Sequence, residues 1–193
     1  MASSGARGTT SARSFAFGAS TPWKRNLGDT REVLVLNAPD SFEPLLASLA
    51  GVRIHRRAVR GFRMQFGIAF AITQAQVDTA ATAMASHSEG DVTLWMAYPK
   101  QSSKKFTCEF NRDNGWAALG ALGFEPVRMV AIDEDWSALR FRRAEFIKSL
   151  TRAPQSALST VGKARAGMSG KPASRPSGSA RAAPDAIGAT RKG

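Results

Sequence analysis

Four short stretches of this chain are almost wholly apolar, and they limit the possible folds more than any other feature. They span residues 33–36, 66–72, 92–97 and 127–132. A strand with one face in water alternates apolar and polar side chains, whereas a nearly continuous apolar run is typical of a strand buried on both faces. Strands of that kind occur mostly in parallel sheets with helices packed on both sides. The sequence therefore predicts an α/β fold around a buried sheet.

Helix patterns lie between these stretches. In the segment 40–49, apolar residues recur at helical spacing after Asp40, a good capping residue. Thr73 and Gln76 have the spacing of a capping box, which predicts that a second helix begins there and continues to about Gly90. A third helix pattern follows in 113–122. Strands that alternate with helices predict right-handed crossovers between parallel strands.

The last two predicted strands form a hairpin around the acidic segment 133–135. In the second of them, 137–142, Leu139 and Phe141 alternate with arginines, as in a strand with one face in water. Together the patterns predict a three-layer, Rossmann-like α/β sandwich with a mostly parallel sheet and a C-terminal antiparallel hairpin. The closing hairpin suggests the shape of the methyltransferase scaffold, by analogy of fold only.

The distribution of charge divides the chain into three parts. The net charge is +12, yet residues 31–150 hold fifteen basic and thirteen acidic residues and are nearly neutral. We expect one folded domain over 30–148, a disordered basic leader over 1–29 and a disordered basic tail over 149–193. The two ends bury too little apolar surface to offset the entropy of ordering. The serine and arginine content of the leader also fits an organelle transit peptide, and the composition leaves this open.

The basic terminal segments predict a polyanionic partner. Such segments attract nucleic acid without sequence preference, and the alternative is that they only keep the protein soluble. A second basic cluster lies in the folded part beside Phe62 and Phe66, and arginine interleaved with aromatic residues suits single-stranded nucleic acid. A solvated connector over residues 53–63 explains that cluster equally well. The candidate nucleic-acid-binding residues are Arg53, Arg56, Arg57, Arg60, Arg63, Lys163, Arg165 and Lys171.

The turn after the first predicted strand argues against a nucleotide cofactor. A dinucleotide or S-adenosylmethionine site needs glycine there, so that the backbone approaches the ligand closely. This chain has Asn37, Ala38, Pro39 and Asp40 instead. The acidic residue that would hold a ribose after the second strand, 52–55, is also missing, as is a Walker loop. We therefore expect no cofactor, and a non-catalytic binding or regulatory module rather than an enzyme.

Polar side chains at the carboxyl ends of the predicted strands support an alternative, an enzyme of unknown reaction with an anion-binding site. The distinctive segment is 98–105, which holds three lysines and two serines. In this hypothesis Tyr98 donates a proton and Lys100 anchors the anion, whereas a solvated basic loop is the simpler interpretation. The candidate ligand-binding residues are Asn37, Asp40, Tyr98, Lys100, Ser102 and Ser103. No catalytic residue is assigned.

Neither a metal site nor a membrane span is expected. His55, His87 and the single cysteine, Cys108, lack metal-ligand spacing, and acids in a tight segment such as 133–135 are typical turn formers. The longest strongly apolar run, 66–72, is too short to span a bilayer, and the N-terminus lacks the apolar core of a secretory signal. One cysteine excludes a disulfide within the chain and fits a reducing compartment. We expect a cytoplasmic protein.

Four segments carry an unusual order of residues: VLVLNAPDSF at 33–42, LWMAYPK at 94–100, DNGW at 113–116 and VAIDEDWSALRFR at 130–142. They resemble a bacterial family of unknown function, DUF3052. The resemblance covers the folded middle of the chain and neither tail, and it implies a bacterial, cytoplasmic protein. It supplies no reaction, cofactor or catalytic residue. The arginine-rich stretch 56–63 and the long tails depart from the pattern of the family.

Overall fold

A computed structural model describes residues 26–149 and 156–168 of the protein, so most of the predicted leader and tail lies outside the described residues. The strands are β1 (Glu32–Leu36), β2 (Arg53–His55), β3 (Met64–Phe70), β4 (Ser88–Pro99), β5 (Phe124–Ala131) and β6 (Trp136–Arg143). The α-helices are α1 (Glu43–Ala47), α2 (Gln74–Ser86), α3 (Ala117–Ala121) and α4 (Thr160–Met168), and the 3-10 helices are η2 (Asp40–Phe42) and η3 (Ala144–Phe146).

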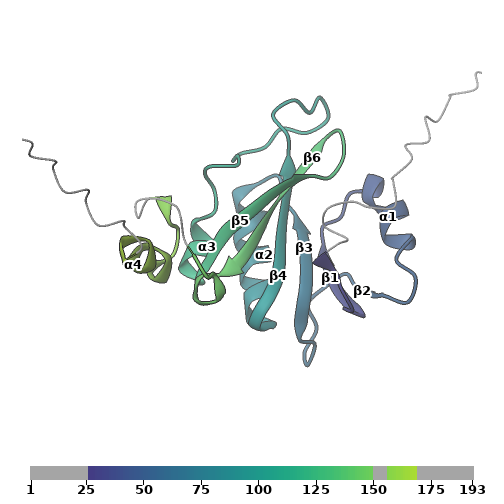
Figure 1. Cartoon of the computed structure of the whole chain (residues 1–193). Coiled ribbons are helices and arrows are strands. Elements are labelled where there is room, and N and C mark those ends of the chain that lie inside the picture. The colour runs from purple at the N-terminus through teal and green to yellow at the C-terminus, as the bar shows by residue number, and fades with distance from the viewer. Residues whose placement is uncertain (1–25, 150–155, 169–193) are drawn as a thin grey trace, which may run out of the picture.

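The strands form a single sheet in the order β2-β1-β3-β4-β6-β5 (Figure 1). β2, β1, β3 and β4 run parallel, β6 pairs antiparallel with β4, and β5 pairs antiparallel with β6 at the end of the sheet. α2 and α3 cover one face of the sheet, and η2 and α1 pack on the other. The predicted Rossmann-like fold with a mostly parallel sheet and a closing hairpin is confirmed.

β4 shows why the apolar runs are nearly continuous. Leu94, Met96 and Tyr98 pack in the core beneath α2 and α3, whereas Trp95 and Ala97 pack in the core on the α1 face. Successive side chains of a strand point to opposite faces, so a strand between two helical layers needs apolar residues at every position.

The helices confirm one detail of the sequence prediction and correct two others. The capping box that opens α2 is confirmed, with Gln76 N–H donating to Thr73 Oγ1 at 3.3 Å. α2 ends at Ser86, however, and Gly90 lies inside β4 with φ +69°, so its predicted role as helix terminator is wrong. The third helix spans only Ala117–Ala121. Asn111 Oδ1 accepts the N–H groups of residues 113 and 114, which closes a turn where the helix was predicted to begin.

The helix α4 lies within the segment predicted to be a disordered tail, so that prediction is wrong for residues 156–168. The buried carboxylate of Glu125, on β5, accepts hydrogen bonds from Ser159 N–H at 2.6 Å, Ser159 Oγ at 2.7 Å and Leu158 N–H at 3.1 Å. These residues directly precede α4, and Ser159 Oγ in turn accepts the N–H of Gly162, which has no partner within the first turn of the helix, at 2.9 Å. Composition missed this helix because a buried acid, rather than a large apolar face, docks it.

Glycine permits the close approach of this segment at two positions. A Cβ on Gly162 of α4 would lie 2.1 Å from Glu125 Oε1, and a Cβ on Gly120 of α3 would lie 2.8 Å from the Leu158 carbonyl oxygen. Neither distance is tolerated by a real side chain. Both glycines therefore belong to the docking of the C-terminal helix.

Candidate functional site

The carboxyl ends of the parallel strands lie together along one side of the sheet, the carboxyl edge, which is distinct from the edge strands β2 and β5. η2 and α1 follow β1 and pack on one face of the sheet, whereas α2 follows β3 and packs on the other. The strand order therefore reverses between β1 and β3. In α/β proteins, ligands commonly bind at such a reversal point. Asn37 lies directly after β1 in the left-handed region, with φ +54°, and its Nδ2 donates to the Phe70 carbonyl at 3.3 Å. Asp40 is exposed in η2. The side chain of Asn37 thus ties the end of β1 to the end of β3.

Aromatic rings pack over the α1 face of the same edge. Phe42 lies 4.7 Å from Phe70, Phe70 lies 5.1 Å from Trp136, and Trp136 lies 5.0 Å from Phe106, measured between ring centroids. Phe42, Phe70 and Trp136 are each at most 3% exposed. Side chains of the chain itself therefore fill the space beside the ends of β1 and β3 on that face.

A cleft of about 930 Å³ lies farther along this edge, beyond the end of β4. Segments 98–103 and 106–113 line it, together with Ser137 at the start of β6. Four of the six predicted ligand-binding residues line this cleft: Tyr98, Lys100, Ser102 and Ser103. Asn37 and Asp40 do not line it and lie instead after β1, with β3 between them and β4.

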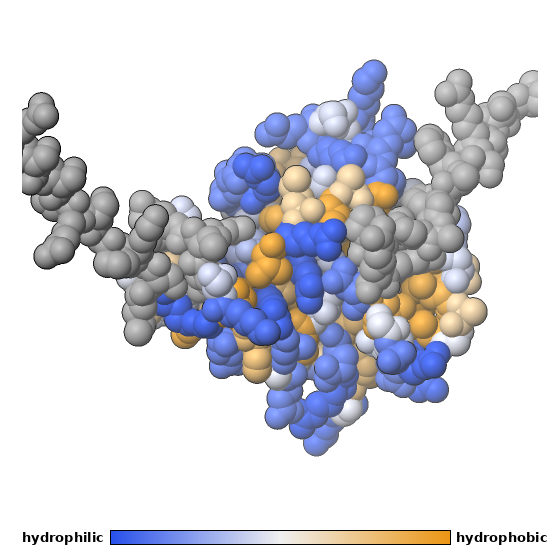
Figure 2. Space-filling model, viewed as in Figure 1, coloured by the Kyte–Doolittle hydropathy of each residue, from blue (hydrophilic) through white to orange (hydrophobic). Residues whose placement is uncertain are grey.

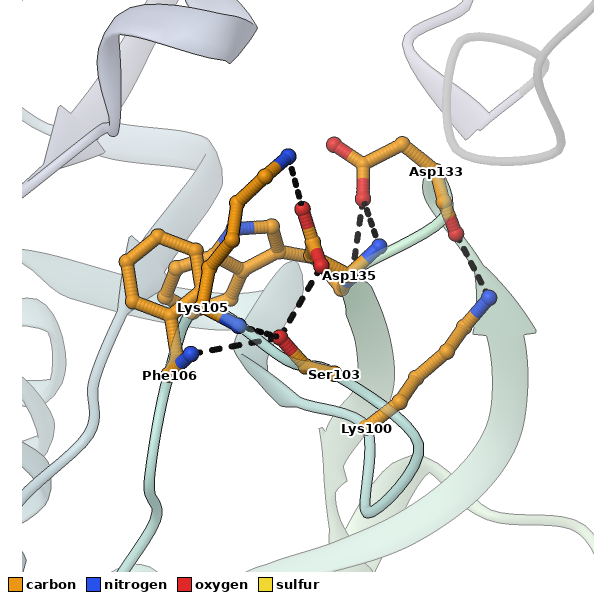
Figure 3. Close-up of polar contacts among 7 residues, drawn as sticks. Lys100, Ser103, Lys105, Phe106, Asp133 and Asp135 are labelled. Atoms are coloured by element: carbon orange, nitrogen blue, oxygen red, sulfur yellow. Dashed lines mark hydrogen bonds and ion pairs between the residues drawn. The ribbon is translucent and has the colours of Figure 1, made fainter.

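An internal carboxylate occupies the part of this region that was predicted to bind an anion (Figure 3). Ser103 Oγ donates to Asp135 Oδ1 at 2.9 Å, and Lys105 Nζ donates to Asp135 Oδ2 at 2.7 Å. Ser103 Oγ also accepts the N–H groups of Lys105 and Phe106. The hydrogen bond from Lys105 holds the pKa of Asp135 below its ordinary value. Ser103 and Lys105 thus bind an anion that comes from the β5–β6 turn.

Lys100 joins the end of β4 to the same turn. Its backbone N–H donates to the Asp135 carbonyl at 2.8 Å, and its Nζ donates to the Asp133 carbonyl at 2.5 Å (Figure 3). Asp133 Oδ1 accepts the N–H groups of Asp135 and Trp136, so this acid shapes the turn, as the sequence indicated. Within the described part of the chain, the ammonium group of Lys100 therefore has a neutral carbonyl, not a carboxylate, as its hydrogen-bond partner.

Three further side chains of the cleft, those of Tyr98, Cys108 and Glu109, are also engaged or deactivated. Burial raises the pKa of Tyr98 and of Cys108, so both stay protonated at neutral pH. The Tyr98 hydroxyl donates to Met129 Sδ at 3.5 Å, and its ring packs edge-on against Trp116. Glu109 Oε2 accepts the N–H of Gln74, the first residue of α2, at 2.7 Å.

The segment 106–113 forms one wall of the cleft, and the sequence prediction missed it. Thr107, Cys108, Glu109, Asn111 and Arg112 all line the cleft from this segment. The available signal was its position, since it is polar and connects a strand end to a helix at the edge where ligands bind. No spacing pattern within it indicated a site.

The predicted arginine cluster is largely neutralised by acids of neighbouring elements. Arg56 makes a bidentate pair with Glu43 at 2.7 and 2.5 Å, Arg53 lies 3.3 Å from Glu32, and Arg63 pairs with Glu89. The two remaining candidates, Arg57 and Arg60, are exposed, with no ion pair among the described residues.

The aromatic residue of this connector is not free for base stacking. The ring of Phe62 lies 4.2 Å from the ring of His55, and His55 Nε2 lies 3.1 Å from Glu32 Oε2. Stacking on a nucleic-acid base would require Phe62 to leave this contact. The connector therefore offers isolated charges rather than a stacking surface.

The three tail candidates have different surroundings. Arg165 Nη2 donates to the Ile147 carbonyl at 2.6 Å, and its Nη1 donates to the Ala144 carbonyl, so this guanidinium fastens α4 to η3. The side chain of Lys163 is exposed on α4. Lys171 lies outside the described residues.

Two other kinds of feature are absent from the described residues. No group of three or more His, Cys, Asp and Glu side chains is arranged to hold a metal ion in residues 26–149 and 156–168. No helix in that same part of the chain has both the length and the apolar character needed to cross a membrane.

Comparisons with known proteins give similarity of fold. No family model and no curated protein sequence matches the chain, so the resemblance to DUF3052 stays a prediction. Among solved structures, the chain is similar to LepI in complex with SAM (TM-score 0.42, 10% identity, 64% of this chain and 47% of that chain).

Two further structures show the same level of similarity. They are the N-methyltransferase NodS from Bradyrhizobium japonicum WM9 (TM-score 0.41, 11% identity, 63% of this chain and 97% of that chain) and TehB from Haemophilus influenzae (TM-score 0.39, 9% identity, 62% and 60%). The chain spans about half the length of LepI. With TM-scores below 0.5, these similarities assign no reaction, cofactor or ligand to this chain.

Proposed function

We propose that this protein is a binding module whose cleft beyond β4 takes a small polar ligand without transforming it. The observation that carries the proposal is that three polar side chains of the cleft are held in bonds within the chain. Ser103 contacts Asp135, Lys100 contacts the Asp133 carbonyl, and Glu109 contacts the first residue of α2. Such bonds stiffen a binding surface and remove the groups that covalent chemistry would use.

Nucleophilic catalysis needs an activated group beside a base. Ser103 Oγ already accepts two backbone N–H groups, and its carboxylate partner, Asp135, has a lowered pKa and is a correspondingly poor base. Burial keeps Cys108 in the thiol form, which is the unreactive one. These three side chains support binding over catalysis.

The charges around the cleft favour a ligand with no large net charge. Lys100 and Arg112 supply two cationic groups, and Glu109 and Asp113 supply two anionic groups. A zwitterion, such as a free amino acid, matches both signs at once. A strong anion would meet the two carboxylates as well as the two cations.

The alternative is an enzyme of unknown reaction on a degenerate methyltransferase-like scaffold, with an anion bound at Lys100. One observation favours it: the only polar partner of the Lys100 ammonium group among the described residues is a neutral carbonyl, so its charge stays available. In that case Tyr98 lies in the same cleft to act as a proton donor.

Titration calorimetry with three probes separates the two proposals. The probes are glutamine as a zwitterion, adenosine monophosphate as an anion, and S-adenosylmethionine. Lys100→Met is compared with Lys148→Met, an exposed lysine remote from the cleft lining. Glutamine binding that Lys100→Met weakens and Lys148→Met does not supports the binding module. Binding of the monophosphate alone, or consumption of S-adenosylmethionine, would replace it with the enzyme.

We further propose that the terminal segments contact nucleic acid without sequence preference. Residues 1–25 carry four basic and no acidic residues, and residues 169–193 carry five basic and one acidic, whereas most arginines of the connector are paired. Duplex DNA binding should then weaken steeply with salt, with a log–log slope of about −0.9 per phosphate neutralised. Deleting both terminal segments, 1–25 and 169–193, should abolish most of the binding, because each carries a net charge of +4. If the affinity for duplex DNA survives this deletion and instead falls in Arg57→Glu, the contact belongs to the connector.

A further inference from the structure

β5 forms an open edge of the sheet. It is the last strand in the order, and β6 is its only sheet neighbour among the described residues. Val127 and Met129 are 38% and 49% exposed, and Arg128 between them is exposed as well. An edge strand with exposed apolar side chains is a template for pairing with a further strand.

The pairing with β6 uses only alternate backbone groups of β5. Ile132 N–H donates to the Trp136 carbonyl at 2.9 Å, immediately beyond the paired residues of the hairpin. In an antiparallel ladder, residues that exchange hydrogen bonds alternate with residues that do not. The N–H and C=O groups of Met129 and Ala131 therefore point away from β6. A strand added at this edge would find donors and acceptors at both positions.

A groove of about 630 Å³ runs beside the edge. Its walls come from residues 126–129 of β5, the loop around Arg112 and Trp116, and residues 156–158 before α4. Met129 faces this groove, and its Sδ accepts the Tyr98 hydroxyl at 3.5 Å. Every second side chain of an added strand would point to the same face as Met129 and enter the groove. Met129, Trp116 and Leu139 supply apolar surface for such side chains, beside the charged side chains of Arg112 and Asp113.

The opposite face of β5 and β6 is basic. Arg128 is the register partner of Arg140, and Arg142 lies on the same face of β6. Asp91 is the carboxylate partner of Arg142, whereas Arg140 donates to Asn26 and Thr93, which are neutral. In the space-filling view, hydrophobic and hydrophilic residues lie side by side over these two strands (Figure 2). Three guanidinium groups with one carboxylate leave an excess of positive charge beside the open edge.

We propose that β5 binds an extended peptide segment of a partner protein, in which acidic and apolar residues alternate, as an additional strand of the sheet. The backbone groups of Met129 and Ala131 pair with the peptide, an acidic side chain lies beside Arg128, and the apolar side chains enter the groove. A second copy of this chain is a poorer occupant. Antiparallel pairing of β5 with itself about Arg128 would place two like charges opposite each other.

Fluorescence anisotropy with a labelled eight-residue peptide of alternating glutamate and valine tests this proposal on the full chain. Two derivatives carry N-methyl groups on all valines or on all glutamates, and a third has lysine in place of glutamate. Arg128→Glu is compared with Arg57→Glu, an exposed arginine on the connector near the other edge of the sheet. Circular dichroism verifies that both variants are folded.

The expected result is saturable binding of the glutamate peptide that Arg128→Glu weakens about tenfold and Arg57→Glu leaves unchanged. One N-methylated derivative should bind and the other should not, because an added strand uses only every second N–H for pairing. Four outcomes would overturn the proposal: a Kd weaker than about 1 mM, equal binding of both methylated peptides, equal binding of the lysine peptide, or a self-association of the protein that Arg128→Glu abolishes.

Discussion

A buried carboxylate holds the start of α4, while Arg165 fastens the helix to η3, and removing the carboxylate is the most direct test of this docking. Glu125 accepts three hydrogen bonds from residues 158 and 159, and none of its surface is exposed. We predict that Glu125→Ala releases α4 while the sheet stays folded. The substitution leaves Ser159 N–H, Ser159 Oγ and Leu158 N–H without their acceptor at once.

The size of the effect follows from the two backbone donors. A buried N–H without an acceptor costs about 1–3 kcal/mol, so two of them weaken docking by about 4 kcal/mol, or roughly a thousandfold. The apolar contacts that oppose this loss are few: the two buried alanines, Ala157 and Ala166, and the half-buried Leu158, which packs against the core. A helix of nine residues is marginal in water by itself, so α4 should unfold once it is released.

Hydrogen exchange followed by mass spectrometry measures this directly. Amides of residues 157–166 should lose their protection in Glu125→Ala, whereas amides of β3 should exchange at the wild-type rate. Glu145→Ala is the matched control, because Glu145 is exposed in η3 and accepts no hydrogen bond from α4 among the described residues. The reasoning is refuted if amides of 157–166 in Glu125→Ala exchange within about threefold of the wild-type rate.

Three further predictions concern other elements. Gly162→Ala should release α4, because the added Cβ would lie 2.1 Å from Glu125 Oε1. In the control Gly167→Ala the added Cβ would meet open space, and this substitution should stabilise the helix by up to about 1 kcal/mol. Equal effects of the two substitutions on hydrogen exchange in α4 would contradict this prediction. The pKa of Asp135 is lowered in the folded protein, so this carboxylate stabilises the fold fully at pH values above its unfolded-state pKa of about 3.9. That contribution is lost as the pH falls through the lower folded-state pKa. The Lys105 amide, followed by NMR, should report that titration, and a midpoint at or above 3.9 would oppose it. Burial raises the pKa of Cys108, so iodoacetamide at neutral pH should alkylate it severalfold more slowly than in the urea-unfolded chain, and equal rates would count against burial.

The sheet could be predicted from the sequence because its central strands are buried on both faces. β1, β3 and β4 have cores above and below, so their apolar residues form runs that no solvated element produces. The hairpin of β5 and β6 was equally visible, since alternation in 137–142 reflects one face with arginines. The capping box of Thr73 and Gln76 is a local signal and was correct for the same reason.

The docked C-terminal helix could not be predicted in the same way. α4 has an alanine- and glycine-rich sequence typical of a disordered tail. Its docking depends on a contact between Glu125 and Ser159, which are 34 positions apart, and on the absence of a side chain at Gly162. Composition and periodicity register neither a long-range hydrogen bond nor a missing Cβ.

The candidate site was predicted in part. The lysine- and serine-rich segment does lie at a strand end and lines a cleft, as the sequence indicated. The acidic turn at 133–135 was recognised as a separate feature, and nothing in the sequence showed that Asp135 would bind to Ser103 and Lys105. A pairing between loops 30 positions apart depends on the antiparallel register of β6 with β4, which appears only in three dimensions.

The same physical device recurs at three places in this fold and limits how an external anion can bind. Glu125 caps the segment before α4, Glu109 accepts the first N–H of α2, and Asp135 bridges Ser103 and Lys105. At each place a carboxylate of the chain itself accepts the hydrogen bonds of groups that could otherwise bind an external anion. An anion entering the cleft at Ser103 must therefore displace Asp135, which would also loosen the β5–β6 turn. A neutral or zwitterionic ligand avoids that cost, which supports the proposal that the cleft takes a zwitterion rather than a phosphate.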